Sequence, residues 1–482
     1  MTTPSSARPS RASRVAFWSL LTLALILAST AIWIRQRFGA VTFEQILSTL
    51  PVGNGAGVGN NDLAVEAAVW CIGLPICLVG AAALLWLRWR RPVRRTVLLV
   101  PATAFAIALG ALLMVAGVPQ YAAAYLDPRT VADYYVTPEP LGRPGRPLNL
   151  ITIYLESTEN TYADAGLFGE NLIAAQQQAT AGWAGYESLR QDPVGGWTMA
   201  GLVATQCAIP LKSVLVTGDP HSNSAGETVE RYLPGATCLG DVLEAEGYTN
   251  TFLGGAHARF AGKDTFLTDH GYTTIRGREE WELSEDPSEL SVWGLSDARL
   301  FEHAKQTLAG LRAAGSPFHL TMLTLDTHEP GAVYGSCDAR AQTPIATALK
   351  CSGAALAGFL DHLGQAGYLD DTVVVVMGDH LKNLGDSDQL RDQLASAPER
   401  TVFFRVHSPN PVSFARQDAD QLSVLPTILD VLGFDLPDGR AGLGVSFASP
   451  HPLEGTLLAL PEPDYTSLLR APSRELYQGF WR

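Results

Sequence analysis

The sequence contains little charge for its length. Only 17% of its 482 residues are Asp, Glu, Lys or Arg, whereas soluble globular chains average roughly 25%. The hydrophobic share of 47% excludes a chain that is disordered throughout, and the net charge of −14 excludes a protein that coats nucleic acid. The sequence also lacks internal repeats and long low-complexity tracts. Its length alone allows two or three domains.

The first 118 residues lack lysine altogether and are nearly free of acidic residues. They contain ten Arg against Glu44, Asp62 and Glu66, for a net charge of +7, so the rest of the chain carries −21. A basic, apolar third followed by an acidic two-thirds is typical of a membrane anchor joined to a water-soluble domain. We therefore assign residues 1–118 to a membrane anchor.

Three apolar runs in this anchor, residues 16–34, 67–87 and 97–118, contain no charged residue. Each would form a helix of about 28 to 33 Å, long enough to cross a hydrocarbon core of about 30 Å. Buried core helices are one alternative. A cleaved signal peptide is another for the first run, although Arg35 and Arg37 follow it where small residues are expected. We predict three transmembrane helices in the lipid bilayer.

Arginine placement predicts the orientation of these helices. Arginines precede the first run and fill the link between the second and third, whereas residues 39–65 contain none: the two groups are Arg8, Arg11 and Arg14, and Arg88, Arg90, Arg91, Arg94 and Arg95. Because arginine is retained on the cytoplasmic side, we expect the N-terminus inside and everything after residue 118 outside. Arg35 and Arg37 oppose this assignment. Residues 41–50 either form a short helix in the membrane surface or pack on the spans.

Cysteine is scarce, and no CxxC or Cys/His zinc spacing is present. Two of the six cysteines lie in the second apolar run. The other four form two sequence-local pairs, Cys207/Cys238 and Cys337/Cys351. Four cysteines allow three pairings, so the local disulfides are a preference and the reduced state stays open. Disulfides would agree with an exported domain.

Beyond a linker at residues 119–147, short apolar segments alternate with helix-like stretches. These segments occupy residues 148–156, 248–255, 318–328, 371–380 and 401–408. Continuous apolar strands predict a sheet buried on both faces, so we expect an α/β fold with helices on each side over residues 148–450. Residues 451–482 form a tail with no assignable role.

Polar residues lie at the carboxyl ends of three of these segments. They are Glu156 and Ser157 after the first, Asp326, Thr327 and His328 after another, and Asp379 and His380 after a third. Chemistry in α/β folds gathers just beyond the carboxyl ends of the strands. Carboxylates and a histidine brought together there suit a divalent cation. The alternative is a set of ordinary strand-end caps and turns, above all for Glu156 taken alone.

The candidate nucleophile lies in the segment GGWTMAGLVATQC, residues 195–207. Two glycines and Trp197 precede Thr198, and a helix-compatible stretch follows. This arrangement places a hydroxyl at a helix N-terminus, where free N–H groups and the helix dipole favour an anionic group. Taken from this segment alone, a threonine at this position is more often a plain N-cap.

At this point the sequence resembles a known family. The segments LNLITIYLESTENTY, GGWTMAGLVATQCAIPL, the run from CLGDVLEAEGY to FAGKDTFLTDHGY, LTMLTLDTHEP and VVVVMGDHLKN follow one another in order. They are similar to the phosphoglycerol transferase I family, in the sulfatase-like branch of the alkaline phosphatase superfamily that also holds lipoteichoic acid synthases. The resemblance covers about residues 148 to 450 and implies the alkaline phosphatase-like α/β fold.

The resemblance also implies roles for individual residues. Glu156, Thr198, Asp379 and His380 would bind a divalent metal, with Mn²⁺ favoured by the resemblance and Zn²⁺ or Mg²⁺ left open. Thr198 would be the nucleophile, and His328 would contact the phosphoryl group or assist proton transfer. Trp197, His257, Arg259 and Lys263 are substrate-binding candidates, against the alternative of a solvated loop.

Two departures from the family pattern concern the site. The usual Ser-Asp-His reads Gly378-Asp379-His380, which keeps both ligands. Lipoteichoic acid synthases carry a His-Gly step where this chain has Leu253-Gly254, so their head-group contacts do not transfer intact.

The function implied by the resemblance is phosphoglycerol transfer from phosphatidylglycerol to a periplasmic glucan, through a covalent glycerophospho-threonine. The chain would be an inner-membrane protein with a periplasmic catalytic domain. Phosphoethanolamine transfer and polyglycerolphosphate synthesis of the lipoteichoic acid type are the enzymatic alternatives, and a membrane sensor or scaffold is the non-enzymatic one. Sulfatase activity is disfavoured, because the Cys/Ser-x-Pro-x-Arg pattern is absent around Thr198. The sequence does not indicate an oligomeric state.

Overall fold

The computed structural model describes residues 11–39, 41, 43, 46, 65–89, 98–142, 145–212, 229–385 and 388–482. The described residues form two compact units. The first comprises the residues up to 123 together with Gly385, and the second comprises residues 124–384 and 388–482. Each unit is described by itself.

The first unit contains apolar helices. They are α1 (Arg11–Phe38), the π-helical η2 (Ala68–Gly73) continuing into α4 (Leu74–Trp89), α5 (Leu99–Val115) and the start of α6 (Val118–Leu126). Two helical stretches, Ala12–Phe38 and Val65–Trp86, are long and apolar enough to cross a membrane. The third predicted span is divided between α5, with 17 residues, and α6 by a turn in which Gly117 has a left-handed φ of 68°. Two such helices suggest membrane anchoring.

Helix α1 packs against α4 and α5 through small residues. Ala24 and Ala31 on α1 and Ala108 on α5 are buried, which lets helix backbones approach closely. At the end of α1, the Arg37 guanidinium forms an ion pair with Glu66. This pair neutralises Arg37, one of the two arginines that oppose the predicted orientation.

Parts of the anchor prediction fall outside the described residues. Arg8, the arginines at 90, 91, 94 and 95, and most of the predicted surface helix at residues 41–50 are among them. The orientation of the anchor and the surface helix therefore stay predictions.

The second unit is built on a seven-stranded sheet in the order β2-β7-β6-β1-β5-β3-β4. The strands are β1 (Asn149–Leu155), β2 (Ala184–Gly185), β3 (Thr249–Gly254), β4 (Tyr272–Arg276), β5 (Phe318–Leu323), β6 (Thr372–Gly378) and β7 (Phe404–His407). Strands β6, β1, β5, β3 and β4 run parallel, and β7 is antiparallel to both β6 and β2. All five predicted strands are present, whereas β2 and β4 were not predicted.

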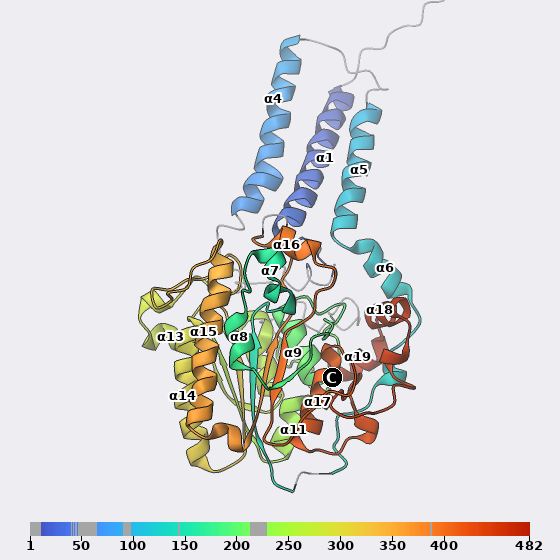
Figure 1. The fold of residues 1–482 in the computed structure, drawn as a ribbon. Helices are drawn as coiled ribbons and strands as arrows, with labels where there is room; N and C mark the ends of the chain where they lie inside the picture. The colour runs from blue at the N-terminus through green and yellow to red at the C-terminus, as the bar shows by residue number, and fades with distance from the viewer. Residues whose placement is uncertain are drawn as a thin grey trace, which may run out of the picture. The chain divides into compact units, whose positions relative to one another are not determined.

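Helices cover both faces of this sheet (Figure 1). One face packs against α9 (Thr198–Cys207), α11 (Leu239–Ala245), α12 (Lys263–Asp269), α17 (Val424–Leu432), α18 (Glu462–Arg470) and α19 (Arg474–Phe480). The other packs against α7 (Ala165–Phe168), α8 (Ala174–Ala179), α13 (Arg278–Ser284), α14 (Asp297–Ala314), α15 (Pro344–Gln365) and α16 (Arg391–Ser396). Successive β1 side chains alternate between the faces, Tyr154 to the first and Ile153 to the second. The predicted α/β layering is confirmed.

The last 32 residues contribute to the core of this unit. Tyr465 on α18 and Tyr477 and Phe480 on α19 are buried in the cluster on the first face. The Tyr477 hydroxyl donates to the carbonyl of Pro210, at 2.6 Å. The chain beyond residue 450 therefore helps to hold the segment that follows α9.

Both sequence-local disulfides, Cys207–Cys238 and Cys337–Cys351, are present in the structure. Cys207 ends α9, and Cys351 lies in α15. Replacing Cys337 by Ser should lower the stability of the second unit by about 3 kcal/mol, because the bridge closes a loop of 14 residues in the unfolded chain. The rate of catalysis should change far less. Thermal melts under non-reducing conditions measure the effect, and an unchanged melting temperature would contradict it.

Candidate active site

The carboxyl ends of two neighbouring parallel strands bring three polar side chains together. Glu156 directly follows β1, and Asp379 and His380 directly follow β6. In the β1–β6 ladder the last residues of the two strands, Leu155 and Gly378, are partners. The register therefore places Glu156 next to Asp379, as the strand-end pattern predicts.

Thr198 reaches the same place from a helix. It is the first residue of α9, and its Oγ1 donates a hydrogen bond to Glu156 Oε2 at 3.3 Å. One turn later, Gly201 packs directly on the backbone of Asp379. A Cβ atom at position 201 would lie only 2.0 Å from the Asp379 carbonyl oxygen. The glycine therefore permits the close approach that sets Thr198 beside the carboxylates.

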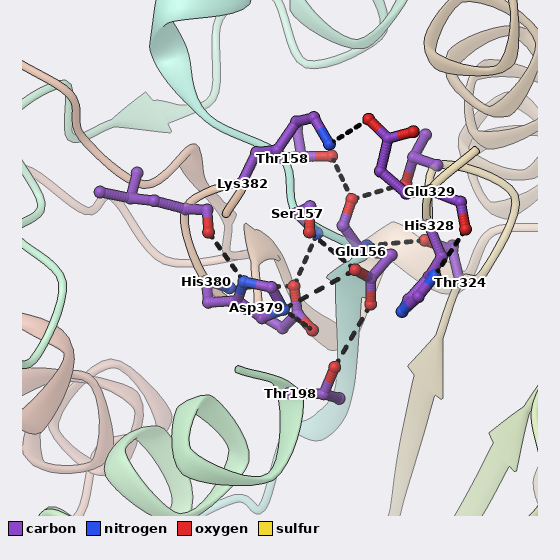
Figure 2. A network of polar contacts seen from close by, with 12 residues as sticks. Glu156, Ser157, Thr158, Thr198, Thr324, His328, Glu329, Asp379, His380 and Lys382 are labelled. Atoms are coloured by element: carbon purple, nitrogen blue, oxygen red, sulfur yellow. Dashed lines mark hydrogen bonds and ion pairs between the residues drawn. The ribbon is translucent and has the colours of Figure 1, made fainter. Parts of the chain in front are cut away.

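Glu156, Asp379 and His380 form a cluster that could hold a metal ion (Figure 2). One potential ligand atom from each lies within 4.8 Å of the others, and all three residues are buried. His380 Nε2 lies 3.7 Å from Glu156 Oε1 and 3.5 Å from Asp379 Oδ2. Two carboxylates, one imidazole and a neighbouring hydroxyl form a donor set that suits a divalent cation.

Hydrogen bonding within the cluster leaves ligand atoms free. Asp379 Oδ2 is buried without a hydrogen-bond partner, whereas Oδ1 accepts from the backbone N–H of Ser157 and His380. His380 Nδ1 lies 2.8 Å from the Leu381 carbonyl oxygen and therefore donates to it, and Nε2 is the nitrogen nearest the two carboxylates. A buried carboxylate oxygen without a hydrogen-bond partner, 3.5 Å from an imidazole nitrogen, fits a bound cation.

The ionisation of the cluster reflects its unbalanced negative charge. Burial, followed by the charge of Glu156, raises the pKa of Asp379 to about 7. Burial also opposes ionisation of Glu156, but the nearby His380 and His328 outweigh it and lower the pKa of this carboxyl. Burial lowers the pKa of His380, yet the two carboxylates raise it above its ordinary value. A proton or a cation is therefore needed between the carboxylates.

The turn after β1 fixes the orientation of Glu156. Ser157 has a left-handed φ of 51°, and its hydroxyl donates to Glu156 Oε1 at 2.7 Å. The Glu156 N–H donates to the Thr324 hydroxyl, and the Glu156 carbonyl accepts from the Thr327 hydroxyl at 2.6 Å. The polar residues after β5 thus hold the backbone of the residue after β1.

The glycine at position 378, where the family usually has serine, has a steric reason in this chain. A Cβ atom on Gly378 would lie 2.0 Å from the Thr158 carbonyl oxygen. The backbone after β1 therefore approaches β6 too closely for any side chain there.

His328 and Lys263 belong to the surroundings of the cluster. In Figure 2, Glu156 lies between His380 and Asp379 on one side and His328 on the other. The ring of His328 packs on Trp293, with the centroids 4.2 Å apart. Lys263, the first residue of α12, is buried and interacts electrostatically with Glu156 and Asp379, while burial lowers its pKa to about 8.

Four other predicted residues are described by contacts outside the cluster or by their exposure. His257 Nδ1 contacts Glu279 Oε1 at 2.9 Å, and the Arg259 side chain is exposed. Trp197 is half-buried and packs against the hydrophobic cluster on the first face of the sheet. Asp326 turns away from the cluster, because its Oδ2 accepts from the Asp297 N–H at 3.0 Å.

A second group of close ligand atoms, Cys207, Cys238 and His270, does not offer a comparable site. The two sulfur atoms are joined in a disulfide. His270 Nδ1 contacts Asp241 Oδ2 at 2.7 Å, and Nε2 contacts the Tyr232 carbonyl at 3.1 Å. Its potential ligand atoms are therefore already engaged.

Two residues near the site were not singled out from the sequence. Lys382 follows His380 by two positions, and Glu329 directly follows His328; they form an ion pair with Nζ 2.5 Å from Oε1. Lys382 lies in the polar segment DHLKN after β6 and does not stand out there, and nothing in the sequence pairs it with a glutamate 53 positions earlier.

Comparisons with known proteins agree with this geometry. The protein-family model described as Sulfatase matches residues 149–434. Phosphoglycerol transferase I from Xanthomonas campestris is 33% identical over 63% of this chain, and that from Escherichia coli is 31% identical over 74%. These matches cover 43% and 46% of the two relatives, so the chain spans less than half of their length.

Two solved structures share the fold. A protein of the alkaline phosphatase superfamily from Vibrio parahaemolyticus matches with a TM-score of 0.52 and 20% identity, over 70% of this chain and 79% of that one. The lipoteichoic acid synthase LtaP from Listeria monocytogenes matches with a TM-score of 0.51 and 15% identity, over 75% and 96%. At these identities the likeness concerns the fold alone. With the family match over more than half of its length, the chain belongs to the sulfatase family.

Proposed function

We propose that this protein transfers a phosphoglycerol group from phosphatidylglycerol to a hydroxyl acceptor, with Thr198 as the nucleophile. The observation that carries the proposal is the contact of Thr198 Oγ1 with Glu156 Oε2 at 3.3 Å, beside Asp379 and His380. Similarity to phosphoglycerol transferase I at 31–33% identity supports the donor group. The absence of a Cys/Ser-x-Pro-x-Arg pattern around Thr198 argues against sulfate-ester hydrolysis.

Transfer would proceed in two displacements at phosphorus. In the first, Thr198 Oγ1 loses its proton toward Glu156 Oε2, attacks phosphorus and forms a glycerophospho-threonine, while the bond to diacylglycerol breaks. In the second, the acceptor hydroxyl attacks phosphorus, the bond to Thr198 breaks, and Thr198 regains its proton. Diacylglycerol and the acceptor occupy the same position opposite Thr198, so one acid–base side chain can protonate the first and deprotonate the second. We assign His328 to protonate the departing diacylglycerol oxygen and to deprotonate the acceptor hydroxyl.

A divalent ion would be held by Glu156, Asp379, His380 and the Thr198 hydroxyl. When bound, it favours the alkoxide form of the threonine and draws charge from the phosphoryl oxygens. The two carboxylates balance the charge of such an ion, and the oxygen-rich set would accommodate Mn²⁺, which the family resemblance favours, as well as Zn²⁺ or Mg²⁺.

Lys263 is the best-placed residue to bind the phosphoryl group of the donor. It is buried, it carries positive charge toward Glu156 and Asp379, and a lysine acts as a point-charge partner for phosphate. His257, Arg259 and Trp197 are proposed to line the same side for the glycerol or the acceptor.

The donor requires a membrane location for the enzyme, because a diacyl lipid stays in the bilayer. We propose three spans, with α5 and the start of α6 as the third, an N-terminus in the cytoplasm, and a catalytic unit on the periplasmic side of the inner membrane. A periplasmic glucan is the proposed acceptor. Phosphoethanolamine transfer and polyglycerolphosphate synthesis use the same kind of nucleophile and remain the enzymatic alternatives. A sensor without activity would not require Glu156, Thr198, Asp379 and His380 together.

The test is intact-mass analysis of the purified protein after incubation with phosphatidylglycerol and, separately, with phosphatidylethanolamine, both without acceptor. We expect a mass increase of one phosphoglycerol unit, mapped to Thr198, with phosphatidylglycerol alone. An adduct formed only with phosphatidylethanolamine would transfer the assignment to the phosphoethanolamine class. No adduct with either lipid would contradict a covalent transferase.

A further inference from the structure

Glu329 is a hydrogen-bonding centre beside His328. Its carbonyl oxygen accepts from His328 Nδ1 at 3.1 Å and from Trp293 Nε1 at 3.1 Å. Because Nδ1 donates to this carbonyl, His328 Nε2 is the nitrogen left to exchange a proton with a substrate. The His328 ring also packs on Trp293, so one residue anchors both the imidazole and the indole that packs against it.

The carboxylate of Glu329 is held by Lys382, from the segment that follows β6. Its Oε1 contacts Lys382 Nζ at 2.5 Å and accepts from the Gln389 N–H at 3.1 Å. Lys382 is buried, with 4% of its side chain exposed, and Figure 2 shows it reaching from the His380 segment to Glu329. The ion pair therefore joins the segment that carries Asp379 and His380 to the segment that carries His328.

The backbone of Lys382 is itself fixed. Its N–H donates to Glu159 Oε1 at 3.2 Å, and its carbonyl accepts from Arg400 Nη2 at 2.6 Å. Arg400 and the fully buried Glu159 form an ion pair. Lys382 thus projects from a rigid support, and its ammonium has little freedom to adopt another position.

From these contacts we propose that Glu329 and Lys382 are positioning residues for His328. Their ion pair fixes the Glu329 carbonyl, and the carbonyl fixes the imidazole so that Nε2 faces the phosphoryl position opposite Thr198. Neither residue touches substrate in this assignment. The inference rests on the proposed function, in which His328 moves a proton in both displacements.

A purely structural ion pair would have other consequences. Loss of a buried pair that only stabilises the fold lowers the amount of folded enzyme, and metal content and rate fall together. A pair that positions His328 lowers kcat while the KM for phosphatidylglycerol and the metal content stay constant. If the pair acts through His328, breaking it should not lower kcat further in a variant that lacks His328.

The experiment compares Glu329→Gln, Lys382→Met and Lys382→Arg with Glu170→Gln as a matched control. Glu170 forms an ion pair of similar length with Lys350 on α15, at 2.6 Å. Each variant is assayed for kcat, KM, bound metal, thermal melting and accumulation of the mass adduct. We expect Glu329→Gln and Lys382→Met to lower kcat about 10- to 100-fold, as loss of supporting contacts around active-site groups typically does. Lys382→Arg should retain most activity, and Glu170→Gln should match the wild type.

The decisive measurement is Glu329→Gln in a His328→Gln background. We expect no further loss of kcat there. An additive loss, or a parallel fall of metal content and kcat in the single variants, would overturn the positioning role. If the wild-type protein forms no adduct with phosphatidylglycerol, the proposed function is wrong, and so is this inference, which rests on it. If the adduct forms and the double variant shows additivity, the inference alone fails.

Discussion

Replacing Thr198 by alanine should abolish phosphoglycerol transfer, with turnover reduced by at least about 10⁴-fold, as for other enzymes that lose their nucleophile. The neighbouring Ser157 and Thr327 hydroxyls orient Glu156: Ser157 donates to Oε1, and Thr327 donates to the Glu156 carbonyl. The adduct formed with phosphatidylglycerol should disappear as well. Radiolabelled or mass-based transfer assays measure the first effect, and intact mass measures the second.

The same variant should remain folded. Thr198 is half-buried and its hydroxyl donates to the Glu156 carboxylate at 3.3 Å, so its loss should cost about 1.5 to 3 kcal/mol, the range for a hydrogen bond to a charged group. Thr198→Ser is the matched control, because it keeps the hydroxyl at the start of α9 and should still form the adduct. Transfer by Thr198→Ala at a rate near that of the wild type would exclude the covalent mechanism.

The sequence was informative about this site because parallel strands end at one edge of a sheet. Glu156 and Asp379 each follow a continuous apolar strand, and such strands form the buried centre of the sheet, where the register is strongly specified. The glycine-rich turn before a helical stretch made Thr198 a candidate, but its role as nucleophile was predicted from the family resemblance and stays a prediction. The five central strands were visible for the same reason, since burial on both faces leaves an uninterrupted apolar run.

The features of the fold and the site that were not predicted depend on long-range contacts, which no local sequence pattern indicates. Strand β4 is at the edge of the sheet and mixes buried and exposed residues, so it lacks the apolar run. Asp379 directly follows β6, whereas Asp326 lies three residues beyond the end of β5, and its carboxylate accepts from the N-terminus of α14 rather than joining the cluster. The Glu329–Lys382 pair joins two strand ends separated by β1. Each of these outcomes is decided by tertiary structure.

Asp379→Asn should eliminate metal binding and lower transfer by more than about 100-fold, because it removes the charge of one of two carboxylates in the cluster. The amide oxygen can still accept from the N–H groups of Ser157 and His380, so the turn is preserved. Metal content per chain after dialysis against Mn²⁺ or Zn²⁺ measures the first effect. Full metal content in the variant would contradict the assignment of Asp379 as a ligand.

Thermal melting distinguishes a metal ligand from a residue that only stabilises the fold. The substitution Asp379→Asn should raise the melting temperature of the metal-free protein and lower it relative to the wild type when metal is bound. Without an ion, Asp379 is buried beside Glu156 and its pKa is raised to about 7, so the folded state binds more protons than the unfolded state between about pH 4 and pH 7. Metal-free wild type therefore loses stability as the pH rises through this window, and metal-free Asp379→Asn, which lacks the repulsion, should melt at a higher temperature at pH 8. Saturating metal should stabilise the wild type by mass action and leave the variant unchanged. The difference between the two melting temperatures should therefore shrink or change sign. A variant that melts below the wild type in both states would instead mean that Asp379 serves the fold and not the ion.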